Sequence, residues 1–324
     1  LWILLPSMVT IFYKSDAQVF DTTNLEILQR LRTSDVLWID MYDLEGEEKR
    51  AVEAFLGTKL QTRAQAEEIE SSSRFSETDD AIFANTNFVI PGPDDYSMET
   101  VSFILCGGVL TTIREVPLRS FVDLQRRIIA FPKNYQSGYI VFTNIIEQRV
   151  DLDADMIEIM NKEIEQYSRK VNIGEDINEE FLIDINQLQE NMMLVRENIV
   201  DKQRVISSML KSEIFPRELM ERLQVSLRDI SSLINHTNFS FERLEYLQNT
   251  VIGIINLDQN KIMKIFTLVS LLLMPPTLVT GFFGMNVFGD TLEAHPWIVW
   301  PAVSLLLIVP VILIILIFKK RRML

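Results

Sequence analysis

The sequence predicts an α/β cytosolic domain with long α-helices, followed by two C-terminal transmembrane helices. Residues 265–289 and 294–318 contain no Lys, Arg, Asp or Glu. As a helix, each stretch would reach about 37 Å, whereas the hydrocarbon core of a bilayer is about 30 Å thick. The residues before them alternate between strand-like and helix-like periods. They contain 27 basic and 43 acidic residues, a net charge of −16. These features exclude an ordinary soluble enzyme.

Residues 1–145 are expected to form the α/β domain, because short apolar runs with a period of two alternate with helical patterns. The expected strands are Met8–Tyr13, Val36–Ile39, Ile82–Val89, Val101–Leu105 and Val109–Arg114, and the expected helices are Leu25–Leu31 and Glu47–Phe55. Turns are expected at Pro91–Asp95 and at Gly107-Gly108.

Residues 146–240 are expected to form acidic cytosolic helices. The stretch 151–190 holds twelve acidic and three basic residues, while apolar residues recur at helical spacing at Phe181, Ile185, Leu188 and Met192. Pro216 interrupts this pattern, and Phe239-Ser240-Phe241 is expected to open the next helix. So acidic a surface repels nucleic acid and favours cations, although it could equally serve only for solvation.

The membrane part is expected to have four segments. A stalk helix at 241–286 would continue into the first membrane helix, followed by an external loop at 287–297, a second membrane helix at 298–318 and a basic tail at 319–324. Lys261, Lys264 and the four basic residues of the tail flank the two helices on one side, and the loop has no basic residue. This asymmetry places both termini in the cytoplasm.

Reactive side chains are scarce. The chain has one cysteine, Cys106, and two histidines, His236 and His295, too few for a cysteine-based or motif-built zinc site. We see no Gly-rich phosphate loop and no triad-like arrangement. The protein is therefore not expected to be an enzyme.

The end of the first apolar run carries the most specific motif, Gly281-Phe282-Phe283-Gly284-Met285-Asn286. An aromatic residue followed by Gly-Met-Asn, before a last membrane helix and a basic tail, resembles the CorA family of divalent-cation channels. The upstream Met274-Pro275 and the stretches 38–40, 70–74 and 260–264 fit the same family. Three departures from the family pattern, Phe283, Pro276 and the loop residues 291–294, concern the choice of ion rather than the architecture.

The resemblance implies a funnel-shaped homopentamer in the inner or plasma membrane, with its pore lined by the first membrane helix of each subunit. The expected substrate is Mg²⁺, with Co²⁺ and Ni²⁺ as further ions. Cytosolic Mg²⁺ would also regulate the channel. The carboxylates that bind regulatory metal are not identified; candidates lie within 151–190 or near Asp229.

Helix geometry supports a pore independently. At 100° per residue, one face within about 40° of Met263 carries the residues Thr267, Ser270, Met274, Thr277 and Gly281. Asn260, one turn before Met263, is assigned to the same pore. A stripe of this kind could instead be a close-packing helix interface. Met274, with a thioether just before the proline pair, is expected to be a hydrophobic gate.

A selectivity filter is expected at Gly284, Met285 and Asn286. Mg²⁺ holds its shell waters tightly, at about 2.0–2.1 Å, so a pore that recognises the hydrated ion needs neutral oxygen acceptors. A ring of Asn286 amides provides them. Gly284 lets the backbone leave the helix, and Met285 is expected to pack. Asp290 and Glu293 would attract cations outside the filter or merely solvate the loop.

Two alternatives remain open. A zinc transporter of the same superfamily would be expected to present His or Cys in its pore, and the predicted pore face has neither. A non-conducting membrane receptor or scaffold would keep the acidic helices but would need neither Asn286 nor a polar stripe.

Overall fold

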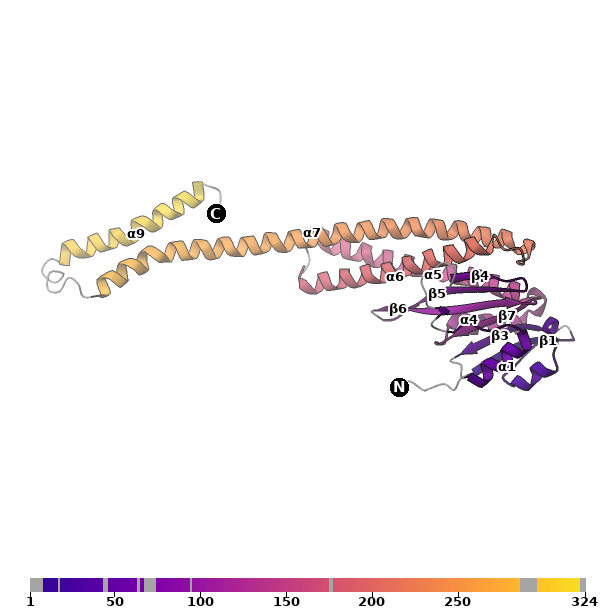
Figure 1. Cartoon of the computed structure of the whole chain (residues 1–324). Coiled ribbons are helices and arrows are strands. Elements are labelled where there is room, and N and C mark those ends of the chain that lie inside the picture. The colour runs from indigo at the N-terminus through magenta and orange to yellow at the C-terminus, as the bar shows by residue number, and fades with distance from the viewer. Residues whose placement is uncertain are drawn as a thin grey trace. The chain divides into compact units, whose positions relative to one another are not determined.

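The computed structural model describes residues 8–16, 18–42, 46–62, 65–66, 74–93, 95–174, 177–285 and 296–320. The chain divides into two compact units, a first unit of residues 1–248 and a second unit of residues 249–324 (Figure 1). The first unit contains a β-sheet and most of the helices. The second contains the C-terminal part of the long helix α7 and the helix α9, as expected for a chain that ends in two apolar helices.

The first unit is built on a seven-stranded sheet with the strand order β2-β1-β3-β7-β6-β5-β4. Its strands are β1 (Met8–Ser15), β2 (Gln18–Thr22), β3 (Val36–Tyr42), β4 (Phe75–Glu77), β5 (Ala81–Pro91), β6 (Tyr96–Cys106) and β7 (Val109–Arg114). Only β3 and β7 pair in parallel among these neighbours. The expected mixed α/β domain with an antiparallel component is confirmed.

Alternating side chains give the sheet two apolar faces. Ile39 faces the helix α1 (Gly46–Leu56), where Val52 is fully buried. Trp38, its neighbour, points to the other face and meets Phe121 of α4 (Arg119–Ala130) edge-on, with ring centroids 5.4 Å apart. Phe142 of α5 (Gly138–Ile173) packs on the same face. Figure 1 shows helices on both sides of the sheet.

Both predicted turns are confirmed. Gly107 and Gly108 have φ angles of +58° and +85°, the two left-handed residues that a type I′ hairpin needs. The other turn joins β5 to β6, and there the Gly92 N–H donates to the Asp95 carbonyl at 3.1 Å. β5 and β6 extend further than the sequence predicts, because they pair with each other over their whole length.

Three long helices follow α4 along the chain: α5, α6 (Glu179–Met209) and α7 (Arg217–Gly284). The predicted apolar stripe of α6 is confirmed, since the side chains of Phe181, Ile185, Leu188 and Met192 are all buried. α5 ends at Gly174, which adopts the left-handed conformation typical of a residue that follows a helix.

Two predictions of local structure are wrong. No helix begins at Phe239–Phe241, because α7 already begins at Arg217, directly after Pro216, and runs for 68 residues. Ser240 lies inside this helix and donates a hydrogen bond to the His236 carbonyl at 2.9 Å, so the polar side chain is accommodated without a break. The expected helix Leu25–Leu31 is only a 3₁₀ turn, Leu25–Gln29. A segment this short cannot offset the cost of helix nucleation.

Candidate functional site

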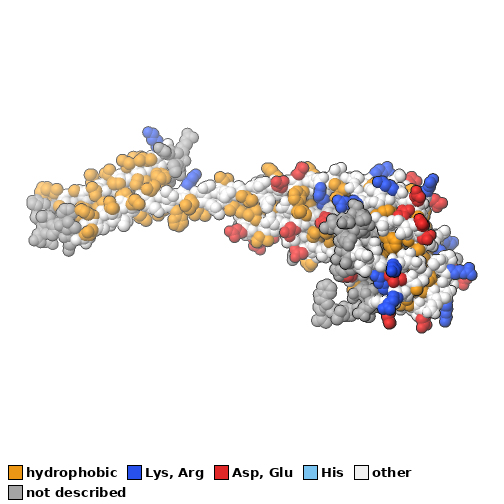
Figure 2. Space-filling model, in the orientation of Figure 1, with side chains coloured by type: hydrophobic (Ala, Val, Ile, Leu, Met, Phe, Trp, Pro, Cys, Tyr) orange, Lys and Arg blue, Asp and Glu red, His pale blue; other side chains and the backbone are white. Residues whose placement is uncertain are grey.

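Two described helices are long and apolar enough to cross a membrane, one within α7 and the other in α9 (Pro296–Lys320). Hydrophobic side chains cover their surfaces, while acidic side chains gather over the first unit (Figure 2). Trp300, at the start of α9, is 69% exposed. In a single chain without lipid, such exposure is expected of membrane-spanning residues.

The two segments share one spacing between aromatic and basic residues. In α7, Lys264 and Phe282 are 18 positions apart, about 27 Å along a helix. In α9, Trp300 and Lys319 are 19 positions apart, about 28 Å. Both lengths match the hydrocarbon thickness of about 30 Å. The aromatic ends adjoin the same loop, so both basic ends face one side of the membrane if each segment spans it.

The predicted filter begins where α7 ends, at Gly284. The Met285 N–H donates to the Phe282 carbonyl at 3.3 Å, which closes the last turn of the helix. Asn286, Asp290 and Glu293 lie outside the described residues. Their roles therefore stay predictions.

The residues predicted to line a pore all lie on α7 and are all exposed in the single chain; they are Asn260, Met263, Thr267, Ser270, Met274, Thr277 and Gly281. On the opposite face of the same segment, Val279 is buried and Leu272 is half-buried, whereas Ile265 and Val269 are exposed. The single chain thus leaves the stripe uncovered and covers the opposite face only in part, and the pore assignment stays a prediction.

The threonines of this stripe have their hydroxyl protons bound within the helix. Thr267 Oγ1 donates to the Met263 carbonyl and Thr277 Oγ1 to the Leu273 carbonyl, both at 2.7 Å. Each oxygen keeps lone pairs that can accept a hydrogen bond from water. Thr280, off the stripe, bonds to the Pro276 carbonyl in the same way, so the pattern is ordinary for threonine in a helix. The threonine oxygens of the stripe can accept hydrogen bonds from the shell waters of a cation, but their helix-internal hydrogen bonds are not specific to a pore.

A proline pair lies beside the predicted gate. Pro275 and Pro276 stand inside the unbroken helix α7, one residue after Met274. Because proline has no N–H, the carbonyls of Leu271 and Leu272 receive no α-helical hydrogen bond from these positions. The helix ladder is therefore weakest next to Met274, where a change in helix direction would cost least.

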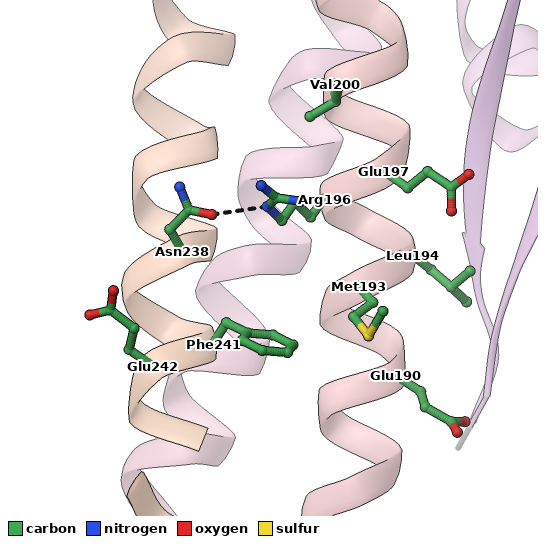
Figure 3. A pocket seen from close by; sticks show the side chains of 9 residues that line it. All are labelled: Glu190, Met193, Leu194, Arg196, Glu197, Val200, Asn238, Phe241 and Glu242. Carbon is green, nitrogen blue, oxygen red and sulfur yellow. Dashed lines mark hydrogen bonds between the residues drawn. The ribbon is translucent and has the colours of Figure 1, made fainter. Parts of the chain in front are cut away.

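A groove between α6 and α7 has a volume of about 900 Å³. Arg196 Nε donates across it to Asn238 Oδ1 at 2.9 Å, and Met193 and Phe241 project into it (Figure 3). Carboxylates lie only at its margins: Glu190, Glu197 and Glu242. The groove presents apolar side chains and one satisfied polar bridge, so it offers no reactive group.

Carboxylates converge where α5 meets α7. Burial raises the pKa of Asp151, and the nearby charges of Asp155, Glu147 and Asp229 raise that pKa further. Arg222 forms a two-point ion pair with Glu147, with Nε 2.8 Å from Oε1. No group of three or more His, Cys, Asp or Glu side chains in the described part of the chain is arranged to hold a metal ion. The regulatory metal site stays a prediction.

A buried ionic network that was not predicted from the sequence joins α6 to the sheet edge. β4 pairs with β5 only at residues 82–84, so the rest of this edge of β5 has no strand beside it in the described structure. Side chains take the place of a strand. The Asn87 N–H donates to Asp201 Oδ2 at 3.0 Å, Lys202 Nζ donates to the Asn87 carbonyl at 3.2 Å, and Arg149 Nη2 donates to the Val89 carbonyl at 2.8 Å.

The same network includes Arg74, which belongs to the stretch 70–74 that resembles the CorA family. Its Nε lies 3.3 Å from Asp201 Oδ1. A signal for the network is present in the sequence, because Asn198 and Lys202 fall on the apolar phase of α6 together with Val205 and Met209. Polar residues at core positions indicate buried partners.

Comparison with known proteins shows the family to which the chain belongs. A model of the family described as CorA-like Mg²⁺ transporter protein matches residues 33–320. The chain belongs to the CorA family. "Magnesium transport protein CorA" of Wolinella succinogenes is 34% identical over 320 residues, covering 97% of this chain and 99% of that protein. The protein of the same name from Escherichia coli K12 is 32% identical over 267 residues, covering 82% and 84%.

Solved structures agree in fold. The complete CorA magnesium transporter from Methanocaldococcus jannaschii has a TM-score of 0.76 at 19% identity, covering 98% of this chain and 99% of that one. The ZntB cytoplasmic domain from Vibrio parahaemolyticus has a TM-score of 0.58 at 17% identity, covering 78% and 99%. At these identities the likeness concerns the fold alone.

Proposed function

We propose that this chain carries Mg²⁺ across the inner or plasma membrane as a CorA-type channel. The observation that carries the proposal is the polar stripe of α7, which leads to Gly284-Met285-Asn286 in a chain that belongs to the CorA family. The protein acts by conduction, so Mg²⁺ moves down its electrochemical gradient without a chemical step.

Five copies would surround one axis, each turning its α7 stripe inward. A ring of Asn286 amide oxygens then accepts hydrogen bonds from the shell waters of the ion, and neutral oxygens bind weakly enough for release. Asp290 and Glu293 raise the local concentration of cations outside this ring. Met274 closes the pore, because a ring of thioethers excludes water when the helices approach.

Cytosolic Mg²⁺ would act as regulator as well as substrate. With both termini in the cytoplasm, five first units carry acidic surfaces that repel one another unless cations intervene. A divalent ion bridging carboxylates of neighbouring subunits favours a tight, closed arrangement by about 1–3 kcal/mol per site. The carboxylates around Asp151 and Asp229 are candidates, because their crowding already raises the pKa of Asp151.

A zinc substrate, the alternative within the same superfamily that the sequence leaves open, is the second candidate. The oxygen and thioether stripe argues against it, because zinc prefers His and Cys ligands.

Flux into proteoliposomes separates the candidates, with Mg²⁺, Co²⁺, Ni²⁺ and Zn²⁺ measured in parallel. We expect Mg²⁺ to enter fastest. Preferential entry of Zn²⁺ would support the second candidate, and the absence of flux for all four ions would indicate a receptor or scaffold.

A further inference from the structure

A second hollow of the first unit lies between the edge strand β4 and the C-terminal half of α6. It has a volume of about 330 Å³ and is lined by Arg74, Phe75, Gln203, Arg204, Ser207 and Ser208. No acidic side chain is among these residues, in a chain whose residues before the first apolar run carry a net charge of −16. The pocket is therefore lined by basic and neutral side chains, although this part of the chain is acidic as a whole.

The ionic network adjoining the pocket carries an unbalanced positive charge. Arg74 pairs with Asp201 and Lys202 pairs with Asp153, and Arg149 interacts electrostatically with Asp153, so three cations meet two anions. Arg149 Nε is buried and has no hydrogen-bond acceptor among the described residues. A buried surplus charge is costly unless an opposite charge lies close by.

The pocket surface adds hydrogen-bond donors that have no partner among the described residues. Arg204 is exposed, and it makes no hydrogen bond or ion pair with any described residue. Ser207 and Ser208 follow it by three and four residues, so their hydroxyls lie on the same face of α6. These hydroxyls likewise have no hydrogen-bond partner in the described structure.

The C-terminal end of α6 repels an anion in this pocket only weakly. The C-terminus of a helix carries roughly half a negative charge. The surplus positive charge of the network and the guanidinium of Arg204 together amount to about two positive charges, so cations dominate the local field.

We propose that this pocket binds a phosphate-bearing anion. Arg204 and the two serine hydroxyls hold phosphate oxygens, because guanidinium and hydroxyl donors match their geometry. Arg74 contributes its charge from the wall of the pocket. Phe75, half-buried and without an aromatic partner among the described residues, offers a ring face on which a nucleobase can stack. A nucleoside phosphate fits these groups better than inorganic phosphate does.

The test is a titration of the purified full-length protein in nanodiscs with inorganic phosphate, ADP and ATP, each with excess EDTA and again with Mg²⁺. Binding is followed by calorimetry and needs no ion flux, so its outcome is independent of the proposed transport function. Three variants are compared with the wild type: Arg204→Glu, Ser207→Ala and, as a charge-matched control outside the pocket, Arg126→Glu on α4.

We expect ADP or ATP to bind more tightly than inorganic phosphate. Arg204→Glu should weaken this binding by at least about tenfold, the fold-change of one charge-assisted hydrogen bond, and Ser207→Ala should weaken it less. Arg126→Glu should bind as the wild type does. Tighter binding of inorganic phosphate would support the phosphate site and overturn the stacking role of Phe75. The proposal fails if none of the three anions binds, or if Arg204→Glu and Arg126→Glu have equal effects.

Discussion

The Lys202 ammonium lies 2.9 Å from the Asp153 carboxylate, and neither side chain is exposed to solvent. The pair is held on both sides, since Asn198 Nδ2 donates to Asp153 Oδ1 at 2.9 Å and Lys202 Nζ also donates to the Asn87 carbonyl. These contacts join α5, α6 and β5 at a sheet edge that would otherwise leave buried backbone groups unpaired. The pair therefore fixes how α6 sits on the sheet.

Replacing Lys202 by Met should destabilise the first unit by about 3–5 kcal/mol, because the Asp153 carboxylate then stays buried without its partner. Denaturant unfolding of the full-length protein, followed by near-UV circular dichroism, measures the change. The control is Lys162→Met on α5, whose ion pair with Glu158 is exposed and should not alter stability measurably. Equal midpoints for both variants would show that the buried pair contributes no more than a surface pair.

Stability should also depend on pH through Lys202. Burial lowers the pKa of Lys202 from 10.5 to about 8, although the carboxylate of Asp153 opposes this shift. Between these two values the unfolded chain holds a proton that the native protein has lost, so the free energy of unfolding rises with pH across this window. Below pH 8 both states are protonated and the cost of burying the charge is fully present.

The measurement is the difference in unfolding free energy between the wild type and Lys202→Met at pH 7, 9 and 10. Taking the difference cancels the contributions of the other groups that titrate in this range. The unfolding free energy of the wild type should rise relative to that of the variant as the pH rises. A constant difference would show that Lys202 keeps an ordinary pKa.

Met274→Gly should raise the basal leak of the closed channel, because the smaller ring lets water fill the constriction. Leu268→Gly, which lies about 140° from Met263 and off the polar stripe, is the matched control for placing glycine in the same helix. Flux at high cytosolic Mg²⁺ measures the leak. If both variants leak equally, loosening of α7 rather than loss of the gate explains the result.

High cytosolic Mg²⁺ should close the channel and low Mg²⁺ should open it. Stopped-flow flux is measured with cytosolic Mg²⁺ varied from micromolar to tens of millimolar, alongside protease protection. Asp151→Asn combined with Asp229→Asn should move closure to higher Mg²⁺, because the bridging site loses charge. Asp123→Asn on α4, which lies outside the candidate stretch and pairs only with the exposed Arg119 in the described structure, should leave the closing concentration unchanged. If neither flux nor protease protection changes with cytosolic Mg²⁺, the feedback hypothesis is wrong, but the channel proposal is not affected.

The sequence predicts best those features that depend on local periods. The hairpin turn at Gly107-Gly108 needs two residues with positive φ, and the core stripe of α6 follows from the spacing of Phe181, Ile185 and the apolar residues after them. The two apolar helices follow from length alone. Each of these can be recognised within one segment of the chain.

Features that depend on distant residues could not be predicted in this way. α7 continues through Phe239-Ser240-Phe241 because packing against other helices outweighs the small helix penalty of these residues. The partners Asp153 and Lys202 are 49 positions apart, so no local pattern joins them. The polar stripe of α7 is visible in the sequence, but its assignment to a pore between copies of the chain stays a prediction.

The most direct test of the channel mechanism is Mg²⁺ uptake into proteoliposomes by the wild type and by Asn286→Ala. The variant removes the amide oxygens proposed to recognise the hydrated ion. We predict that Asn286→Ala assembles to the same oligomer, as judged by size-exclusion chromatography with light scattering, and that its Mg²⁺ uptake falls to the level of empty vesicles. Near-normal Mg²⁺ uptake by the correctly assembled variant would contradict the assignment of Asn286 to the selectivity filter.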